Sequence, residues 1–204
     1  MSDYYTDMFR IPFLHVEVRN WNIKKQRLKA LFSFDNQSSE YHYKDITTDY
    51  YYKINNFNSD EVKISNEKVN EILLEEIEIF KSFFQLDNHK IILNWFQKSL
   101  PGQYHEVHNH GSYGYTAVCY IDYDERVHQP TKFIAPFNHF LKGDTLNFVP
   151  ENIKEGSLIF FPSSINHYSS PNHSETSRTI LSMNIKVQNK SDANKQNIFD
   201  TIRP

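Results

Sequence analysis

The residue pattern changes after Asn88, and this change constrains the fold more than any other feature of the sequence. Beyond it, short apolar segments alternate with clusters of Pro, Gly, Asn and Asp. Short runs with a period of two are typical of β-strands, because successive side chains of a strand point to opposite faces. No helix-length segment separates these runs, so we expect an antiparallel sandwich or barrel. The predicted strands cover residues 90–96, 103–110, 115–122, 131–137, 144–149, 157–161 and 178–187.

The first part of the chain predicts helices that cover this sheet. Residues 8–18 are apolar and aromatic, and they predict an edge strand because Pro12 cannot donate a ladder hydrogen bond. A short amphipathic helix is predicted from Asn22, and a longer one from Ser65, a residue type that caps helices. We leave residues 35–60, with their run of tyrosines, unassigned.

Length and composition favour a single folded domain. The 204 residues are 39% hydrophobic and 15% aromatic, which is enough apolar material for one well-buried core. We therefore expect one domain over residues 1–204, mainly β with flanking helices. Its helical support elements are expected at about 22–86, its strands at about 90–187, and a polar tail at 188–204.

Charge and cysteine content limit the classes of partner. Lys and Arg number 22, Asp and Glu number 25, and the net charge of -3 makes nucleic acid an unfavoured partner. The single cysteine, Cys119, excludes an internal disulfide framework and lies in an apolar run typical of a core. No apolar stretch approaches the ~20 residues that span a bilayer, and the start of the chain lacks a signal-peptide pattern. We expect a soluble, cytoplasmic protein with no membrane partner, and we leave open whether it forms homo-oligomers.

Three of the 10 histidines lie within the segment QYHEVHNHG. On a regular strand Tyr104, Glu106, His108 and His110 share one face, while His105 points to the other. Two imidazoles that are two residues apart can occupy neighbouring positions around one metal ion. The pair alone is a weak signal, because a solvated strand end that is rich in histidine has the same pattern.

A competing motif begins at His105. The order His-Glu-Val-His resembles the start of the H-E-x-x-H zinc-protease motif, which needs its second histidine four residues after the first, on a helix. Asn109 occupies that position, and the surrounding residues predict a strand. We therefore exclude a zinc-protease site.

A second group of residues lies near the end of the chain. The predicted strand 157–161 runs into Pro162 and a turn, His167 follows, and Arg178 opens the last strand after ten intervening residues. In a barrel, we expect His167 to converge with the H-x-H pair and Arg178 to point into the same cavity. A buried guanidinium is costly without an anionic partner, so a carboxylate of the protein or of a ligand is expected there.

These motifs together resemble the non-haem Fe(II), 2-oxoglutarate-dependent dioxygenases. The resemblance rests on the H-x-H pair, on Gly156, Phe161-Pro162 and His167 in that order, and on the spacing of His167 and Arg178. It is closest to the small single-domain oxygenases of bacteria and tailed phages, which also open with an F-x-x-P strand, here FRIP. The resemblance covers residues 8–187.

The resemblance implies a double-stranded β-helix, the cupin-like jelly roll, with Fe(II) as metal, 2-oxoglutarate as cosubstrate and O2. It implies His108, His110 and His167 as metal ligands, and Arg178 as the partner of the distal carboxylate of 2-oxoglutarate. His110 stands where most relatives have Asp or Glu, the usual ligand set being two histidines and one carboxylate. We favour a working three-histidine site; the alternative is that Glu106 supplies the carboxylate.

Two further residues are candidates for contact with the cosubstrate. Ser182 shares the face of Arg178 by its period of two, and Tyr104 shares the face of the histidine pair. The alternatives are that Ser182 is simply hydrated at a strand end and that Tyr104 packs against the barrel. We assign no catalytic residue beyond the metal ligands.

The reaction implied by the resemblance is hydroxylation of a substrate carbon, with release of succinate and CO2. The substrate is a small molecule or a peptidyl group, and its identity is not written in the sequence. Two alternatives come from other classes. One is a cupin-type oxygenase or isomerase that uses three histidines without 2-oxoglutarate, and the other is a non-catalytic jelly-roll binding module.

Overall fold

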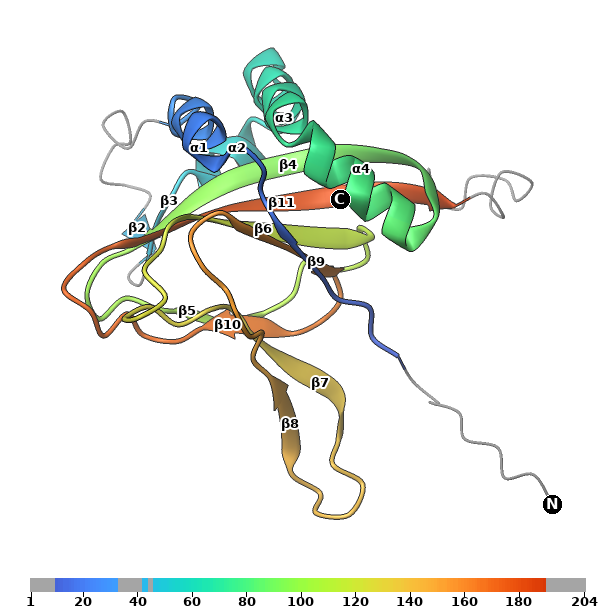
Figure 1. The fold of residues 1–204 in the computed structure, drawn as a ribbon, viewed down its shortest axis with the longest axis vertical. Helices are drawn as coiled ribbons and strands as arrows, with labels where there is room; N and C mark the ends of the chain where they lie inside the picture. Colours follow the sequence, from blue (N-terminus) through green and yellow to red (C-terminus); the bar gives the residue numbers. More distant parts are fainter. Residues whose placement is uncertain (1–9, 33–41, 44–45, 190–204) are drawn as a thin grey trace.

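The computed structural model describes residues 10–32, 42–43 and 46–189, and it arranges them as two antiparallel sheets with helices on one side. The helices lie over the outer face of the larger sheet, and the smaller sheet lies on the opposite side (Figure 1). The predicted polar tail from 190 onward lies outside the described residues. The mainly β fold with flanking helices is confirmed.

The larger sheet has seven strands in the order β1-β9-β6-β11-β4-β3-β2. β4 and β11 pair over their whole length, from Arg178 opposite Ser99 to Asn189 opposite Leu86. β1 lies at an edge, as the proline before it predicts. The strands are β1 (Leu14–Glu17), β2 (His42–Tyr43), β3 (Ile46–Thr48), β4 (Leu86–Ser99), β6 (Tyr115–Asp122), β9 (Ser157–Pro162) and β11 (Arg178–Asn189).

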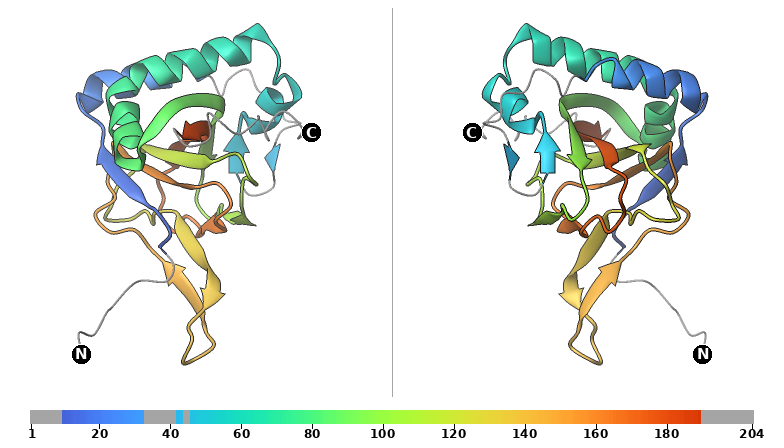
Figure 2. Two further views of the ribbon diagram at one scale, coloured as in Figure 1. Left: turned by 90° about the vertical axis from the view of Figure 1, so that its right-hand side faces the viewer. Right: turned by 90° about the vertical axis from the view of Figure 1, so that its left-hand side faces the viewer.

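The smaller sheet has the order β5-β10-β7-β8. Its strands are β5 (His105–His108), β7 (Lys132–Asn138), β8 (Thr145–Phe148) and β10 (His167–Ser169). The short β10, which the sequence pattern did not predict, joins β5 to β7 and places His167 directly opposite His108. The β7–β8 hairpin projects away from the helices (Figure 2).

Four helices cover the larger sheet: α1 (Trp21–Lys29), α2 (Tyr50–Asn55), α3 (Asp60–Ile72) and α4 (Leu74–Phe84). The single long helix predicted from Ser65 is wrong. Its true cap is Ser59, whose side chain accepts a hydrogen bond from the Val62 amide, and the chain changes direction at the fully buried Leu73. The break allows both α3 and α4 to keep an apolar side on the sheet. No helix in the described part of the chain is long and apolar enough to cross a membrane.

The cap predicted for α1 is also wrong. Asn20, and not Asn22, precedes the helix, and its backbone is left-handed with a φ of 52°. Asparagine tolerates this conformation better than most residues. The unassigned region 35–60 proves to contain β2, β3 and α2.

The larger sheet is buried on both faces, and this explains its uninterrupted apolar strands. Ala117, Cys119 and Ile121 of β6 join the core beneath the helices, whereas Val118 and Tyr120 join the core between the two sheets. The prediction that the cysteine is a core residue is confirmed, and burial raises the pKa of its thiol. The same alternation along β11 sends four side chains toward the smaller sheet, namely Arg178, Ile180, Ser182 and Asn184.

Candidate metal centre

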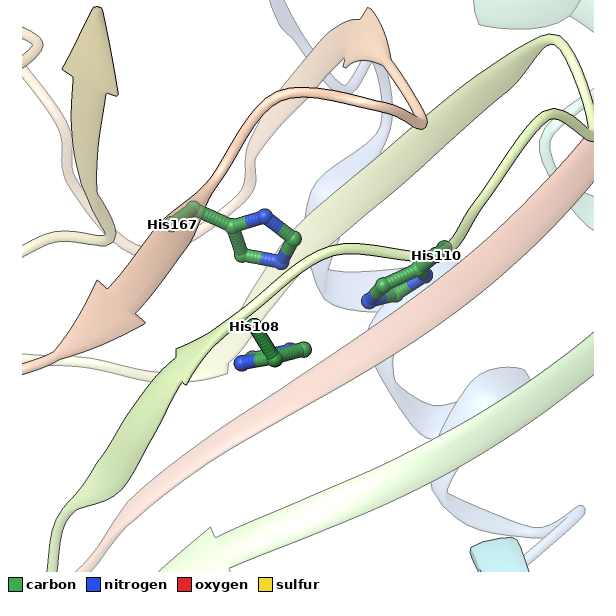
Figure 3. Close-up of side chains that lie close together, drawn as sticks. All are labelled: His108, His110 and His167. Atoms are coloured by element: carbon green, nitrogen blue, oxygen red, sulfur yellow. The ribbon is translucent and has the colours of Figure 1, made fainter. Parts of the chain in front are cut away.

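Three histidines meet between the two sheets, as Figure 3 shows. His108 ends β5, His110 lies in the loop that follows, and His167 begins β10. The backbone amide of His110 donates to the carbonyl of Ser163 at 2.8 Å, which ties this loop to the end of β9. One nitrogen from each ring lies within 4.8 Å of the other two. The sequence prediction that these histidines converge is confirmed.

Hydrogen bonds fix the same tautomer in all three rings. Nδ1 of His108 donates to the carbonyl oxygen of Glu106 at 2.7 Å, and Nδ1 of His167 donates to that of Ile165 at 2.9 Å. Nδ1 of His110 donates to Oδ1 of Asn184 at 2.6 Å. An oxygen that can only accept requires the proton on Nδ1, so each Nε2 keeps its lone pair for a metal.

Burial lowers the pKa of each of these imidazoles. The pKa of His110 falls to about 4 and that of His167 to about 2, and the pKa of His108 shifts in the same direction. Desolvation of the charged ring is the largest cause in all three cases. The three rings are therefore neutral near pH 7, which is the form that binds a metal ion.

β5 departs from regular pairing, and this places a fourth histidine at the site. The step from His105 to His108 is three residues, whereas the paired step from Ser169 to His167 is two. The extra residue forms a β-bulge and reverses the side-chain alternation. The ring centroids of His105 and His108 consequently lie 3.9 Å apart, and the expectation that His105 points away is wrong.

Two other residues of this segment lie outside the histidine cluster. Glu106 is exposed, and its carboxylate is not part of the potential metal-binding group found in the described chain. The alternative in which it supplies a carboxylate ligand therefore has no support in the structure. Tyr104 is 36% exposed and lines neither of the two cavities beside the histidines. Its proposed contact with the cosubstrate stays a prediction.

An outer cavity of about 300 Å³ opens beside His108 and His110. Its wall includes Thr48 of β3 and the two tyrosines that begin α2, elements that the sequence left unassigned. The run of three tyrosines was visible in the sequence, but it has no period that separates cavity-facing from exposed positions. The two tyrosines are Tyr50 and Tyr51, and the remaining lining residues are Ile46, Trp95, Gln97, His105, Asn109, Tyr113 and Asn184.

An inner cavity continues from the histidines toward the space between the sheets. Its lining includes Ser182 of β11 and Ser169 of β10, as well as Thr131 and Ile180. Its volume is about 10 Å³, which is room for roughly one water molecule. The surrounding side chains must therefore separate before a five-carbon dicarboxylate can enter.

Arg178 lies behind Ser169, fully buried, with its guanidinium hydrogen-bonded to the Ser169 hydroxyl and to the Gln129 carbonyl. Its Nε has no hydrogen-bond partner within the described residues, and burial lowers its pKa. A buried cation with an unused donor fits an anionic ligand. The arginine borders a separate cavity of about 30 Å³, so it reaches the inner cavity only past Ser169, which is less direct than the sequence predicted.

Residues 94–184 match the model of a protein family described as "Putative 2OG-Fe(II) oxygenase". This segment contains all three histidines, Arg178, Ser182 and Asn184. Among curated proteins, none matches the chain significantly.

Solved structures share the fold across most of the chain. A viral collagen prolyl hydroxylase from Paramecium bursaria Chlorella virus-1 is 17% identical, with a TM-score of 0.53, and 92% of this chain matches 98% of that one. A prolyl-4-hydroxylase from Pseudomonas putida is 12% identical, with a TM-score of 0.50, over 88% and 94% of the two chains. An oxidoreductase of the 2OG-Fe(II) oxygenase family from Burkholderia pseudomallei is 13% identical, with a TM-score of 0.50, over 84% of each chain. At these identities the likeness concerns the double-stranded β-helix fold alone, which confirms the predicted fold.

Proposed function

We propose that this chain is a 2OG-Fe(II) oxygenase, which its matched segment and its fold support. It would hydroxylate a carbon of a small-molecule or peptidyl substrate. Members of this class are oxidoreductases that use Fe(II), 2-oxoglutarate and O2. The observation that carries the proposal is the convergence of three neutral histidines, each with Nδ1 already bonded, in front of a buried arginine. A cytoplasmic location stays a prediction from the sequence.

The residues present fit the metal. Fe(II) would be held through Nε2 of His108, His110 and His167. Among the residues that the structure describes, this cluster contains no carboxylate. Three neutral ligands leave the full charge of the ion at the site, whereas the usual two-histidine, one-carboxylate set cancels one unit. We expect this charge to strengthen the attraction of an anionic cosubstrate.

The cosubstrate would lie in a widened inner cavity. Arg178 would hold its distal carboxylate, and Ser182 and Ser169 would offer hydroxyl groups along its length. When bound, iron with 2-oxoglutarate and O2 supplies oxidative decarboxylation to succinate and CO2, coupled to hydroxylation of a substrate carbon. The chain itself positions the substrate in the outer cavity and limits the access of water to the inner one.

The experiment that tests this function measures succinate formed from 2-oxoglutarate by Fe(II)-loaded protein in air. We expect slow succinate formation without added substrate, and its loss in His167→Ala. His139→Ala, in the loop of the β7–β8 hairpin, is the matched control and should form succinate at the parent rate. Iron binding without any succinate would contradict the proposal and favour a three-histidine site that works without 2-oxoglutarate.

A further inference from the structure

The outer cavity carries an inference about the substrate, and this inference rests on the proposed function. We propose that the substrate presents an uncharged, mainly apolar group there, of the size of an amino-acid side chain or a small ring. The group carries a hydrogen-bond acceptor beside the carbon that reacts. The cavity, at about 300 Å³, is at the lower end of the range for ligand pockets, so it holds one such group and not a whole peptide.

The lining of the outer cavity is aromatic and neutral. Tyr50 packs edge to face on Trp95 with centroids 5.1 Å apart, and Trp95 lies 5.3 Å from His110. This aromatic wall leads from α2 to the metal ligands, and Tyr51 and Tyr113 extend it. Among the residues that the structure describes, none that lines the cavity is Asp, Glu, Lys or Arg. A charged substrate group would lose its hydration there without meeting a counter-ion from this described lining, which is costly.

The nearest charges on α2 are used to hold the helix in place. Asp49 pairs with Lys53 at 2.9 Å and accepts a hydrogen bond from the Phe96 amide of β4. Lys53 also donates to the side chain of Asn94, and both members of the pair are buried. The charges are therefore compensated within the protein, and α2 presents its tyrosines to the cavity as a fixed wall.

His105 supplies the polar contact. The amide nitrogen of Gln97 lies 3.1 Å from Nδ1 of His105, and an amide nitrogen can only donate. The proton of the imidazole therefore resides on Nε2, and the ring lines both cavities between the aromatic wall and the metal ligands. A carbonyl or hydroxyl oxygen of the substrate can accept a hydrogen bond from this N–H group.

A binding measurement tests this inference without any turnover. The chain has two tryptophans: Trp95 in the cavity, and Trp21 on α1, whose indole is hydrogen-bonded to Glu155. In Trp21→Phe protein loaded with Fe(II) and 2-oxoglutarate without O2, fluorescence reports the cavity alone. The probes are N-acetyl amides of leucine and proline, compared with those of lysine and glutamate.

We expect the neutral probes to change Trp95 fluorescence with saturation, and the charged probes to bind at least tenfold more weakly. Tyr113→Glu, at the rim, should reverse this order in favour of the lysine amide, whereas Tyr52→Phe, on the outside of α2, should leave it unchanged. Equal or tighter binding of either charged probe, or no binding of any probe, would overturn the inference. Succinate formation, measured separately, decides the proposed function itself.

A separate observation, the hydrogen bond between His110 and Asn184, carries a second inference. We infer that Asn184 is a positioning residue that orients the ring of His110, so that a histidine can act as the third ligand. Backbone carbonyls hold the rings of His108 and His167, each from a residue two positions earlier. His110 lies in a loop and instead uses the side chain of a distant strand.

The surroundings of Asn184 restrict it to this role. It is buried on β11 opposite Thr116 of β6, whose hydroxyl lies 3.4 Å from Oδ1 of Asn184 and 3.2 Å from Nδ1 of His110. The same hydroxyl lies 3.0 Å from that of Ser163. Outer partners of this kind orient a ligand and commonly account for about 10–100-fold of metal affinity.

Co(II) titration of metal-free protein tests this inference through visible absorption. We expect Asn184→Ala to weaken Co(II) binding roughly 10–100-fold, and Asn184→Asp to restore or exceed the parent affinity because a carboxylate then faces Nδ1. Met183→Leu, on the opposite face of the same strand, is the matched control and should bind as the parent does. In metal-free protein, histidine ¹⁵N shifts should show a tautomer mixture at His110 only in Asn184→Ala. The inference would be overturned if Asn184→Ala kept the Co(II) affinity and the His110 tautomer of the parent protein. If Asn184→Ala fails to fold, weaker Co(II) binding by Asn184→Asp than by the parent would overturn it.

Discussion

β5 and β11 contribute to the same site but differ in regularity. β11 pairs with a neighbour on each side; its register with β4 is continuous from Arg178 to Asn184, and its register with β6 shifts once, between Thr179 and Ile180. β5 is a short edge strand with a bulge, so His105 and His108 lie on one side although they are three residues apart. The regular strand carries residues expected to bind the cosubstrate, and the irregular one carries His108, a proposed metal ligand. A bulge can therefore bring to one side two imidazoles that regular alternation would place on opposite faces.

The largest expected effect separates the two histidines of the bulged strand. His108→Ala should weaken Co(II) binding more than the roughly 10–100-fold expected for loss of an outer partner, because a direct ligand is removed. His105→Ala should keep the parent affinity, because the ring of His105 is not one of the three that form the cluster found among the described residues. Isothermal titration calorimetry measures both. Equal losses in the two variants would mean that the bulge supplies a fourth ligand.

The next effect concerns the loop between β5 and β6, which lies against β11. Gly114 has a φ of +115°, and a Cβ there would lie 2.9 Å from the Ile185 carbonyl oxygen of β11. We expect Gly114→Ala to lower the free energy of unfolding by about 2–3 kcal/mol in urea denaturation. Gly143→Ala, with φ +74° and open space around it, should cost about 1 kcal/mol. Equal costs would show that the loop does not depend on its contact with β11.

Stability should depend on pH through the buried histidines. The folded pKa values of His110 and His167 are about 4 and about 2, below the ordinary 6.5 that the unfolded chain retains. The unfolded state therefore binds more protons below pH 6.5, and stability is lost as the pH falls from 6.5 toward these values. Urea denaturation of the metal-free protein should show a decrease between pH 7 and pH 5, of at most about 1.4 kcal/mol per pH unit for each histidine. The double variant His110→Gln, His167→Gln should show a smaller decrease; an unchanged slope would contradict the assignment.

The smallest expected effect is at Glu106. Because its carboxylate is exposed and outside the cluster, Glu106→Gln should change Co(II) affinity less than about twofold, within the range of an ordinary surface substitution. Calorimetry of the purified variant measures this. A loss comparable to that of His108→Ala would revive the carboxylate alternative and contradict the three-histidine site.

Regular alternation explains which parts of the molecule the sequence could predict. The strand 115–122 was predicted with the bounds that the structure has, and the face shared by Arg178 and Ser182 followed from its period of two. The bulge at His105 has no local signature, because it depends on how β5 pairs with the unpredicted β10. Tyr50 and Tyr51 could not be singled out within the tyrosine-rich region, because α2 is a single short helix held by Asp49 and Lys53, a pairing visible only once β4 is in place.

The most direct test of the three-histidine oxygenase site is an anaerobic titration of Fe(II)-loaded protein with 2-oxoglutarate. We expect a weak visible charge-transfer band that saturates with 2-oxoglutarate, and about 10–100-fold weaker saturation in Arg178→Ala, because a buried charge-assisted contact is lost. Absence of the band with iron bound, or a band that saturates equally in both proteins, would contradict the assignment of the cosubstrate to this arginine.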